Sequence, residues 1–498
     1  MPPALLDSTC LAALPLRTRL TGAVGVLALG VATLGAADAQ AFQQPREVQL
    51  YSHDYRNASV PGNGPSRGAV MSQDRRLNRV IAFESDASNL VSGDTNGSTD
   101  VFFTTRSGSY GSRGSRYQPG SVQLASRGRG GQPANGRSWG AAVGGVGARA
   151  PKCVAFVSEA SNLVRGDTNK RADAFVYWIS SRKIQRVSTD SRNRQARGSS
   201  TSITVDGDCT KVAFTSDADN LALTRGGRSE WRQARSRTPK RGTTQVYMKF
   251  IRPTAKTERE FKNLTMVISR RGSHPGNRNS SQPHMVAMWG RTVVYSSDAS
   301  NLVRSDSNGS SDVFAFEWAP KWSRGQRNLL HKTKAVSGTS SSRTANGASQ
   351  NPEIAPFAGS VVYETTASDL VGNGSEPKAV RTDLRTYRDY HVGARRTGGT
   401  RAPSVTGQSK WVFYEAKGAG GLPETWLWFE NRQDRSQQIG VPAANPTTST
   451  HGNYLTVESP VRPQYVKNGS RTNGLASGLT GTSLSQPGQL WLIWTDEQ

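Results

Sequence analysis

The sequence predicts an all-β protein built as a seven-bladed β-propeller. Three observations predict this fold: a repeated strand–turn–strand motif, the spacing of its copies, and complementary partial units at the two ends of the chain. The motif is clearest at residues 80–105, VIAFESDASNLVSGDTNGSTDVFFTT, and returns at 153–179 and 293–318. In each copy, two short runs of β-branched and aromatic residues flank a polar turn, which is the pattern of two strands.

Weaker copies complete a series in which the second strand of each unit is expected near residues 80, 153, 211, 292, 360, 411 and 453. Candidate first strands precede four of these at 68–72, 202–205, 285–289 and 353–357. Candidate fourth strands follow at 121–126, 183–189, 264–269, 332–337, 390–394 and 437–441. Four strands make one propeller blade. The average spacing of about 62 residues exceeds that of a WD repeat, so long loops are expected.

The two ends of the chain complement each other. The last unit provides a strand near 453 and another at 489–494, but no fourth strand. Residues 47–52, EVQLYS, resemble the fourth-strand run SVQLAS at 121–126. A last blade built from both ends leaves no open edge strand, so we expect the N-terminal strand to close the ring. Six blades is the alternative count.

Residues 1–39 predict a signal peptide. A segment ending in Arg17 and Arg19 is followed by an apolar run at 20–37 and by small residues around Ala39. An uncleaved signal anchor is the alternative. We expect an exported protein, periplasmic or extracellular, with no membrane span after cleavage. The mature chain then has a short linker at 40–45 and one propeller domain at 46–498.

The repeated string AF-x-S-x-ASNLV-x-GDTNG resembles the TolB-like, WD-repeat-like β-propellers of exported bacterial proteins. The resemblance covers nearly the whole mature chain and is strongest at 80, 153 and 293. The Pro-Asp-Gly typical of that family is reduced to Asp206-Gly207, and no room remains for the α/β domain that precedes the propeller in TolB. The resemblance implies a six- or seven-bladed propeller in a periplasmic or extracellular setting. It does not imply the role of TolB itself.

The polar turns of three units suggest two interpretations. Their oxygen-bearing side chains are Asp94, Asn96 and Asp100; Asp167, Asn169 and Asp173; and Asp306, Asn308 and Asp312. Calcium favours such ligands, but the EF-hand pattern requires an oxygen ligand at the fifth position and glycine at the sixth. Here Arg171 or a serine is fifth, and the glycine, where present, is fourth. Asx-turns explain the pattern better, so we expect no cofactor, with calcium as the alternative.

Cys153 and Cys209 lie at the start of the second strand in neighbouring units. Export would place them in an oxidising compartment, where a disulfide persists. A bridge needs Cα atoms within about 7 Å, and second strands of neighbouring blades are normally farther apart. The sequence therefore leaves the bridged and the free pair both open.

The loop at 223–244 replaces the polar turn of the third unit with a basic insertion. Its candidate polyanion-binding residues are Arg225, Arg228, Trp231, Arg232, Arg235, Arg237, Lys240 and Arg241. Trp231 is a candidate because an indole can stack on a base or a sugar ring. The net charge of +26 also favours anionic partners. A solvated insertion and a general compositional excess of arginine are the alternatives.

The predicted first strands carry mostly small and apolar residues, and the sequence shows no catalytic constellation. We therefore expect a non-catalytic binding module of the cell envelope, whose partner is an envelope protein, a glycan or another anionic polymer. The alternative is a glycan-processing enzyme, a lyase or hydrolase, with its site at the central channel. The sequence does not determine the oligomeric state.

Overall fold

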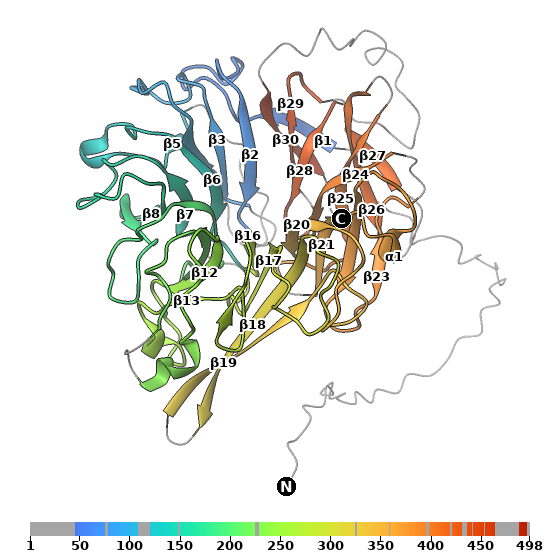
Figure 1. Cartoon of the computed structure of the whole chain (residues 1–498). Coiled ribbons are helices and arrows are strands. Elements are labelled where there is room, and N and C mark those ends of the chain that lie inside the picture. The colour runs from blue at the N-terminus through green and yellow to red at the C-terminus, as the bar shows by residue number, and fades with distance from the viewer. Residues whose placement is uncertain are drawn as a thin grey trace, which may run out of the picture. The chain divides into compact units, whose positions relative to one another are not determined.

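The computed structural model describes residues 45–74, 78–107, 120–147, 150–224, 229–323, 326–357, 359–394, 398–418, 421–430, 436–440, 442–452, 454–463 and 488–495. These residues form seven four-stranded antiparallel sheets and one two-stranded ribbon. Figure 1 shows the sheets as blades around a common centre. The predicted seven-bladed propeller is confirmed. The predicted signal peptide and most of the linker lie outside the described residues.

Blades 1 to 3 follow one another along the chain. Blade 1 contains β2 (Ser66–Met71), β3 (Val80–Ser85), β4 (Asp100–Thr105) and β5 (Val122–Leu124). Blade 2 contains β6 (Ser138–Val143), β7 (Cys153–Ser158), β8 (Asp173–Trp178) and β9 (Lys183–Arg186). Blade 3 contains β10 (Ser200–Val205), β11 (Lys211–Ser216), β12 (Gln245–Phe250) and β13 (Thr265–Val267). The ribbon β14 (Arg270–Arg271) and β15 (His274–Pro275) leads to blade 4.

Blades 4 to 7 complete the ring. Blade 4 contains β16 (Ser280–Met285), β17 (Thr292–Ser297), β18 (Asp312–Ser323) and β19 (Gln326–Ala335). Blade 5 contains β20 (Ser349–Ile354), β21 (Ser360–Thr365), β22 (Lys378–Asp383) and β23 (Asp389–His391). Blade 6 contains β24 (Thr400–Val405), β25 (Trp411–Lys417), β26 (Pro423–Phe429) and β27 (Ser436–Gly440). Blade 7 contains β28 (Ala444–Thr448), β29 (Tyr454–Ser459), β30 (Gln489–Thr495) and β1 (Pro45–Leu50).

Short helices lie in the loops. They are the 3-10 helices η1 (Arg129–Gly131), η2 (Ser229–Ala234) and η3 (Arg259–Phe261), and the α-helix α1 (Ser368–Val371). Among the residues that the structure describes, no helix is long and apolar enough to cross a membrane.

The aromatic residue repeated in the second strands has a defined packing role. In blade 1, Phe83 lies opposite Phe102 of the third strand, with ring centroids 5.9 Å apart. The pair Phe214–Tyr247 repeats this stacked arrangement in blade 3 at 5.9 Å. These rings are fully buried in the cores between blades. Directly opposed aromatic pairs stabilise an antiparallel sheet, so the sequence repeat marks the core.

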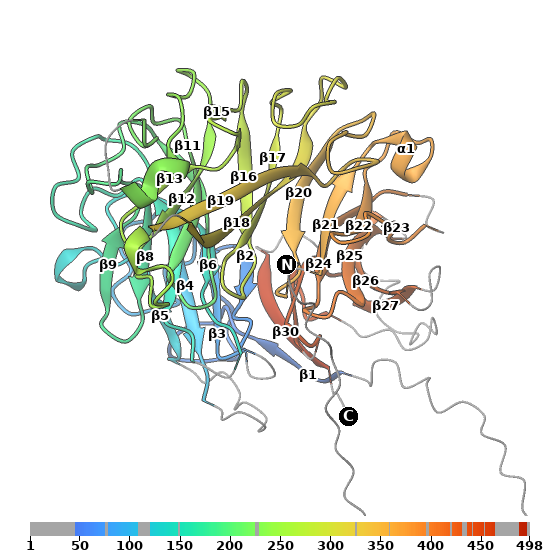
Figure 2. The same ribbon diagram turned by 90° about the horizontal axis from the view of Figure 1, so that it is seen from below.

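The N-terminal strand closes the ring, as predicted. β1 pairs antiparallel with β30 in a register that sets Val48 opposite Ile493. Just beyond it, Ser52 Oγ donates a hydrogen bond of 2.9 Å to Gln489 Oε1. Figure 2 shows the two strands side by side, although they are separated by almost the whole chain. The last blade therefore has four strands, like the other six.

The predicted positions of two first strands are wrong. The structure places them at Ser280–Met285 and Ser349–Ile354, a few residues before the predicted runs at 285–289 and 353–357. Each contains a proline, which normally argues against a strand. The innermost strand of a blade has a ladder partner on one side only, and a bulge sits beside each proline. A proline is therefore tolerated there.

Blades 2 and 3 are also joined covalently. The structure links Cys153 and Cys209 in a disulfide, with Cα atoms 6.3 Å apart. Cys209 reaches across because it lies in the turn before β11 with φ of 56°. Both cysteines are fully buried.

Candidate functional site

The basic insertion of blade 3 is folded against blade 4. Its helix η2 contacts β19, the outer strand of a long hairpin formed with β18. Figures 1 and 2 show this hairpin extending beyond its own blade toward the insertion. Trp231 of η2 is only 7% exposed, and its Nε1–H donates to the carbonyl of Glu260 at 3.0 Å. The sequence-based proposal that Trp231 stacks on a ligand is wrong, because the indole belongs to the core.

Buried Arg270 holds the end of η2 in place. Its guanidinium donates hydrogen bonds to the carbonyls of Gln233 at 2.6 Å, and of Ala234 and Arg235 at 2.9 Å. The last carbonyls of a helix have no partners within the helix, so a buried cation there both caps and anchors it. Burial lowers the pKa of Arg270 to about 10, which still leaves it charged at neutral pH.

His331 of β19 completes this contact between the loop and the hairpin. Its Nε2 lies within hydrogen-bond distance of the Arg270 guanidinium, and its ring stacks on Phe316 with centroids 5.4 Å apart. Burial and the nearby Arg270 lower the pKa of His331 to about 4. The imidazole is therefore neutral at pH 7 and can accept a hydrogen bond from Arg270.

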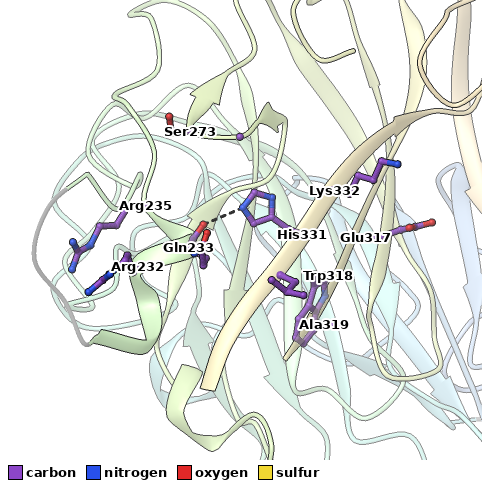
Figure 3. A pocket seen from close by; sticks show the side chains of 11 residues that line it. Arg232, Gln233, Arg235, Ser273, Glu317, Trp318, Ala319, His331 and Lys332 are labelled. Atoms are coloured by element: carbon purple, nitrogen blue, oxygen red, sulfur yellow. Dashed lines mark hydrogen bonds between the residues drawn. The ribbon is translucent and has the colours of Figure 1, made fainter. Parts of the chain in front are cut away.

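A groove of about 740 Å³ lies between η2 and the hairpin. We call it the rim groove; its lining residues are Arg232, Gln233, Arg235, Gly272, Ser273, Glu317, Trp318, Ala319, Leu330, His331 and Lys332. Figure 3 shows Arg232 and Arg235 on the loop side and Lys332 on β19. The one acid in this lining, Glu317, is ion-paired with Lys334 at 2.7 Å. The uncompensated charge of the groove is therefore positive.

The other candidate residues of the basic insertion are not among those that line the rim groove. Arg237, Lys240 and Arg241 are exposed, and Arg241 lies 3.4 Å from the carboxylate of Asp219. Arg225 and Arg228 lie outside the described residues. Lys332 also lines the groove. No sequence pattern links it to the insertion, because only the fold brings the two segments together.

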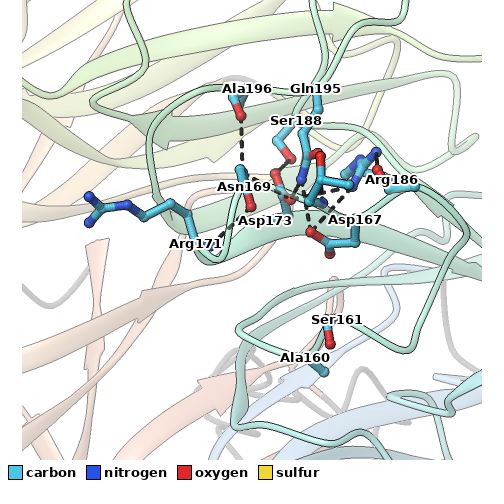
Figure 4. A network of polar contacts seen from close by, with 12 residues as sticks. Ala160, Ser161, Asp167, Asn169, Arg171, Asp173, Arg186, Ser188, Gln195 and Ala196 are labelled. Carbon is cyan, nitrogen blue, oxygen red and sulfur yellow. Dashed lines mark hydrogen bonds and ion pairs between the residues drawn. The ribbon is translucent and has the colours of Figure 1, made fainter.

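The turns considered for calcium are held by hydrogen bonds. In blade 2 the Asn169 side-chain oxygen accepts the N–H of Arg171 at 2.9 Å, and its Nδ2 donates to Ala196 O at 3.0 Å and to Asp173 at 3.4 Å. Asp173 also accepts from Ser188 and Gln195, as Figure 4 shows. This is the geometry of an Asx-turn.

The equivalent residues of blades 1 and 4, Asn96 with Asp100 and Asn308 with Asp312, repeat the arrangement. Burial raises the pKa of both aspartates to about 7. Asp94 and Asp306 are the remaining calcium candidates of these blades, and burial raises the pKa of both. Among the described residues, no three His, Cys, Asp or Glu side chains are placed to hold a metal ion.

A ring of carboxylates lies near one end of the innermost strands. Four consecutive blades carry glutamate at the fifth position of the second strand: Glu364, Glu415, Glu458 and Glu84. Each accepts a backbone N–H from the innermost strand of the next blade at 2.9–3.0 Å. Burial raises the pKa of Glu84 and of Glu458, and Glu415 adds to the effect on Glu458. These side chains join adjacent blades, and Arg67 lies 3.7 Å from the Glu84 carboxylate.

The innermost strands themselves are more polar than predicted. Gln282 and Asn351 are exposed, and His284 and Glu353 are half-buried. The expectation of small and apolar innermost strands is wrong for blades 4 and 5, because those strands begin earlier than predicted. A signal in the sequence could have located these strands: each has a proline between two polar residues, at 282–284 and at 351–353. In the structure each proline lies beside a bulge.

Comparison with known proteins supports the fold alone. No protein-family model and no curated protein matches the sequence. Among solved structures, an oligogalacturonate lyase in complex with manganese is 9% identical, with a TM-score of 0.46, covering 88% of this chain and 99% of that one. TolB from Acinetobacter baumannii is 11% identical, with a TM-score of 0.36, covering 76% and 65%.

The β-propeller domain of the trilobed protease from Pyrococcus furiosus is 10% identical, with a TM-score of 0.43, covering 87% of this chain and 95% of that one. As a statement about fold, the resemblance to TolB-like propellers is confirmed. The similar structures include binding proteins and enzymes, so they do not separate these two functions.

Proposed function

We propose that this protein is an exported, non-catalytic propeller that binds an anionic polymer along the rim groove. One observation carries the proposal. The basic insertion folds onto the hairpin of the next blade, so that Arg232, Arg235 and Lys332 line one groove without an unpaired acid. A surface of this kind attracts a chain of negative charges and releases its counterions.

The anchoring of η2 favours binding. Arg270 fixes the backbone of Gln233, Ala234 and Arg235, so the cations beside them are held on an ordered segment. A binding surface that is ordered before the ligand arrives loses less conformational entropy on association. Export is supported by the signal-like leader and by the Cys153–Cys209 disulfide, which is typical of oxidising compartments.

The test uses the mature protein with two probes, a heparin oligosaccharide and a single-stranded DNA oligomer. Replacing Arg232, Arg235 and Lys332 by serine should weaken binding to both probes. For the DNA, the slope of log affinity against log salt should flatten by about two, at about 0.7 per lost contact. Arg232 and Lys332 are exposed and Arg235 is half-buried. Exposed sites contribute within about 0.5 kcal/mol each, so any fall in melting temperature should come mainly from Arg235.

A matched control removes the same charge elsewhere. Arg165, Arg171 and Arg197 are exposed on the loops of blade 2, and their replacement by serine should leave most of the affinity intact. The buried Arg106, which lies over the ring of Tyr454, is unsuitable as a control. If both triple variants lose affinity equally, the +26 charge acts diffusely and the groove is not the site.

A glycan-processing enzyme is the second candidate, and His284 with Glu353 on neighbouring innermost strands favours it. Burial raises the pKa of Glu353 to about 7, in the range useful to a general acid. The test is to incubate the protein with glycans and measure new reducing ends or unsaturated products. Turnover that disappears in Glu353→Gln would support this function, and no turnover on any glycan would argue against it.

A further inference from the structure

Two neighbouring innermost strands concentrate hydrogen-bonding side chains at positions that reach solvent. β16 contributes Gln282 and His284, and β20 contributes Asn351 and Glu353. The innermost strands contact those of the blades on either side, and Figure 1 shows them surrounding the centre of the ring. A solvent-exposed side chain on an innermost strand therefore lies at the centre of the ring or near one of its two ends.

These four side chains are fixed in position. His284 Nδ1 accepts the N–H of Ile354 at 3.2 Å, so the neutral imidazole carries its proton on Nε2 as a donor. Burial keeps it neutral by lowering its pKa to about 4. Glu353 Oε1 accepts the N–H of Val405 at 2.9 Å.

The two exposed amides also bond each other. Gln282 Nε2 donates to the side-chain oxygen of Asn351, and the Asn351 N–H donates back to Gln282 Oε1 at 3.1 Å. Each amide nitrogen has two hydrogens, and no more than one from each side chain is used in this pair. The wall formed by blades 4 and 5 therefore presents a fixed array of hydrogen-bonding groups.

The opposite wall differs in character. In a ring of seven, blade 1 lies opposite blades 4 and 5, and blade 2 lies opposite blades 5 and 6. At the corresponding positions blade 1 has Gly68 and Val70, and blade 2 has Gly140 and Ala142. Beside Gly140 lies Trp139, a half-buried indole whose N–H donates to Thr201 O at 3.0 Å. The innermost strands of blades 1 and 2 thus carry small residues at these positions, and Trp139 lies next to them with Arg137 over its ring at 5.0 Å.

We propose that the centre of the propeller binds an uncharged carbohydrate, whose hydroxyl groups meet Gln282, Asn351, His284 and Glu353 while Trp139 contacts a sugar ring. Amides, imidazole and carboxyl groups donate to and accept from hydroxyls, and an indole is suited to the apolar face of a sugar. Among these four side chains there is no fixed positive charge, because the imidazole of His284 is neutral. This site is separate from the rim groove, but it uses the same His284 and Glu353 as the glycan-processing candidate. Saturable binding without turnover would support the binding site and argue against the enzyme.

The probes are maltotriose, cellotriose and triacetylchitotriose, titrated calorimetrically into the mature protein. We expect at least one of them to bind saturably. The double variant Gln282→Gly with Asn351→Gly should bind it about tenfold more weakly or worse, because two hydrogen-bonding groups are lost. Both residues have φ of 54°, which glycine adopts easily, and Gly68 and Gly140 occupy the same position in blades 1 and 2. The double variant should therefore fold.

Trp139→Thr tests the aromatic contact, since Thr201 holds the equivalent position in blade 3. It should weaken sugar binding and abolish the change in tryptophan fluorescence on binding. Trp289→Thr is the control, because that indole is 62% exposed on the turn after β16. The proposal is overturned if none of the three sugars binds saturably, or if the double glycine variant binds them as well as the parent protein.

Discussion

Replacing Glu353 by glutamine is expected to stabilise the propeller at pH 8 and to change its stability little at pH 4. The Glu353 carboxylate accepts hydrogen bonds from the N–H of Val405 and from Ser404 Oγ at 2.9 and 3.2 Å. A glutamine oxygen can accept both. The two side chains differ mainly in charge. At high pH glutamate carries a negative charge in a largely desolvated position, whereas glutamine stays neutral.

The size of the effect follows from the pKa. Burial raises the pKa of Glu353 from its ordinary 4.5 to about 7. The carboxyl group therefore contributes stability that is fully present below pH 4.5 and is lost as the pH rises through 7. At about 1.4 kcal/mol per pH unit, the difference between pH 4 and pH 8 amounts to about 3 kcal/mol. This is an upper limit, because the side chain keeps some contact with solvent.

The assay is urea unfolding at pH 4 and pH 8, followed by tryptophan fluorescence. The quantity of interest is the free energy of unfolding of Glu353→Gln minus that of the parent protein. The pH-dependent contributions of the other titrating groups are the same in both proteins and cancel in this difference. We expect the difference to rise with pH. Glu376→Gln is the control, since that carboxylate is 59% exposed and its pairing with Arg401 is exposed too. A difference that is equal at both pH values would refute the reasoning.

Three further predictions concern the architecture. Thiol titration of the unfolded, unreduced protein should find no free thiol at Cys153 or Cys209, and replacing both by alanine should cost up to about 4 kcal/mol, given their separation of 56 residues. Deleting residues 46–52 should expose β30 and cause aggregation, and an unchanged melting curve would contradict the observed closure. Mass analysis of the exported protein should find a mature N-terminus at Gln40 or Phe42; a full-length, membrane-held product would disprove cleavage.

The repeat made the blades predictable because it coincides with the core. Phe83 and its equivalents are buried at the same position in each sheet, and the residue there is aromatic in six blades and Val457 in blade 7. The closure was also predictable, because a blade that lacks one strand requires a partner for its edge and residues 47–52 supply the matching pattern. Both features depend on local sequence and on a simple rule about unpaired edges.

The innermost strands of blades 4 and 5 were misplaced for a physical reason. Pro283 and Pro352 interrupt the alternation of polar and apolar residues, so the sequence pattern favours the apolar runs that follow them as strands. At the inner edge of a blade, proline costs no ladder hydrogen bond on its unpaired side. The polar residues beside these prolines were therefore lost from the prediction, and with them the candidate site at the centre.

The rim groove could not be predicted because it depends on contacts between segments distant in sequence. Arg232 and Lys332 are a hundred positions apart, and the length of the β18–β19 hairpin brings them together. The basic insertion was expected to be either a solvated loop or a binding loop. Its apolar residues Leu223, Trp231 and Ala234 instead enter the core, and the packing of Trp231 holds the neighbouring arginines in position.

The distribution of charge argues that the two proposed surfaces bind different ligands. The rim groove has uncompensated arginine and lysine, whereas the groups proposed at the centre are two amides, a neutral imidazole and the carboxyl group of Glu353. Surface charges interact over roughly 8 Å at physiological ionic strength, so each surface acts mainly through its own groups despite the overall charge of +26. The two proposed ligands should therefore bind without competing.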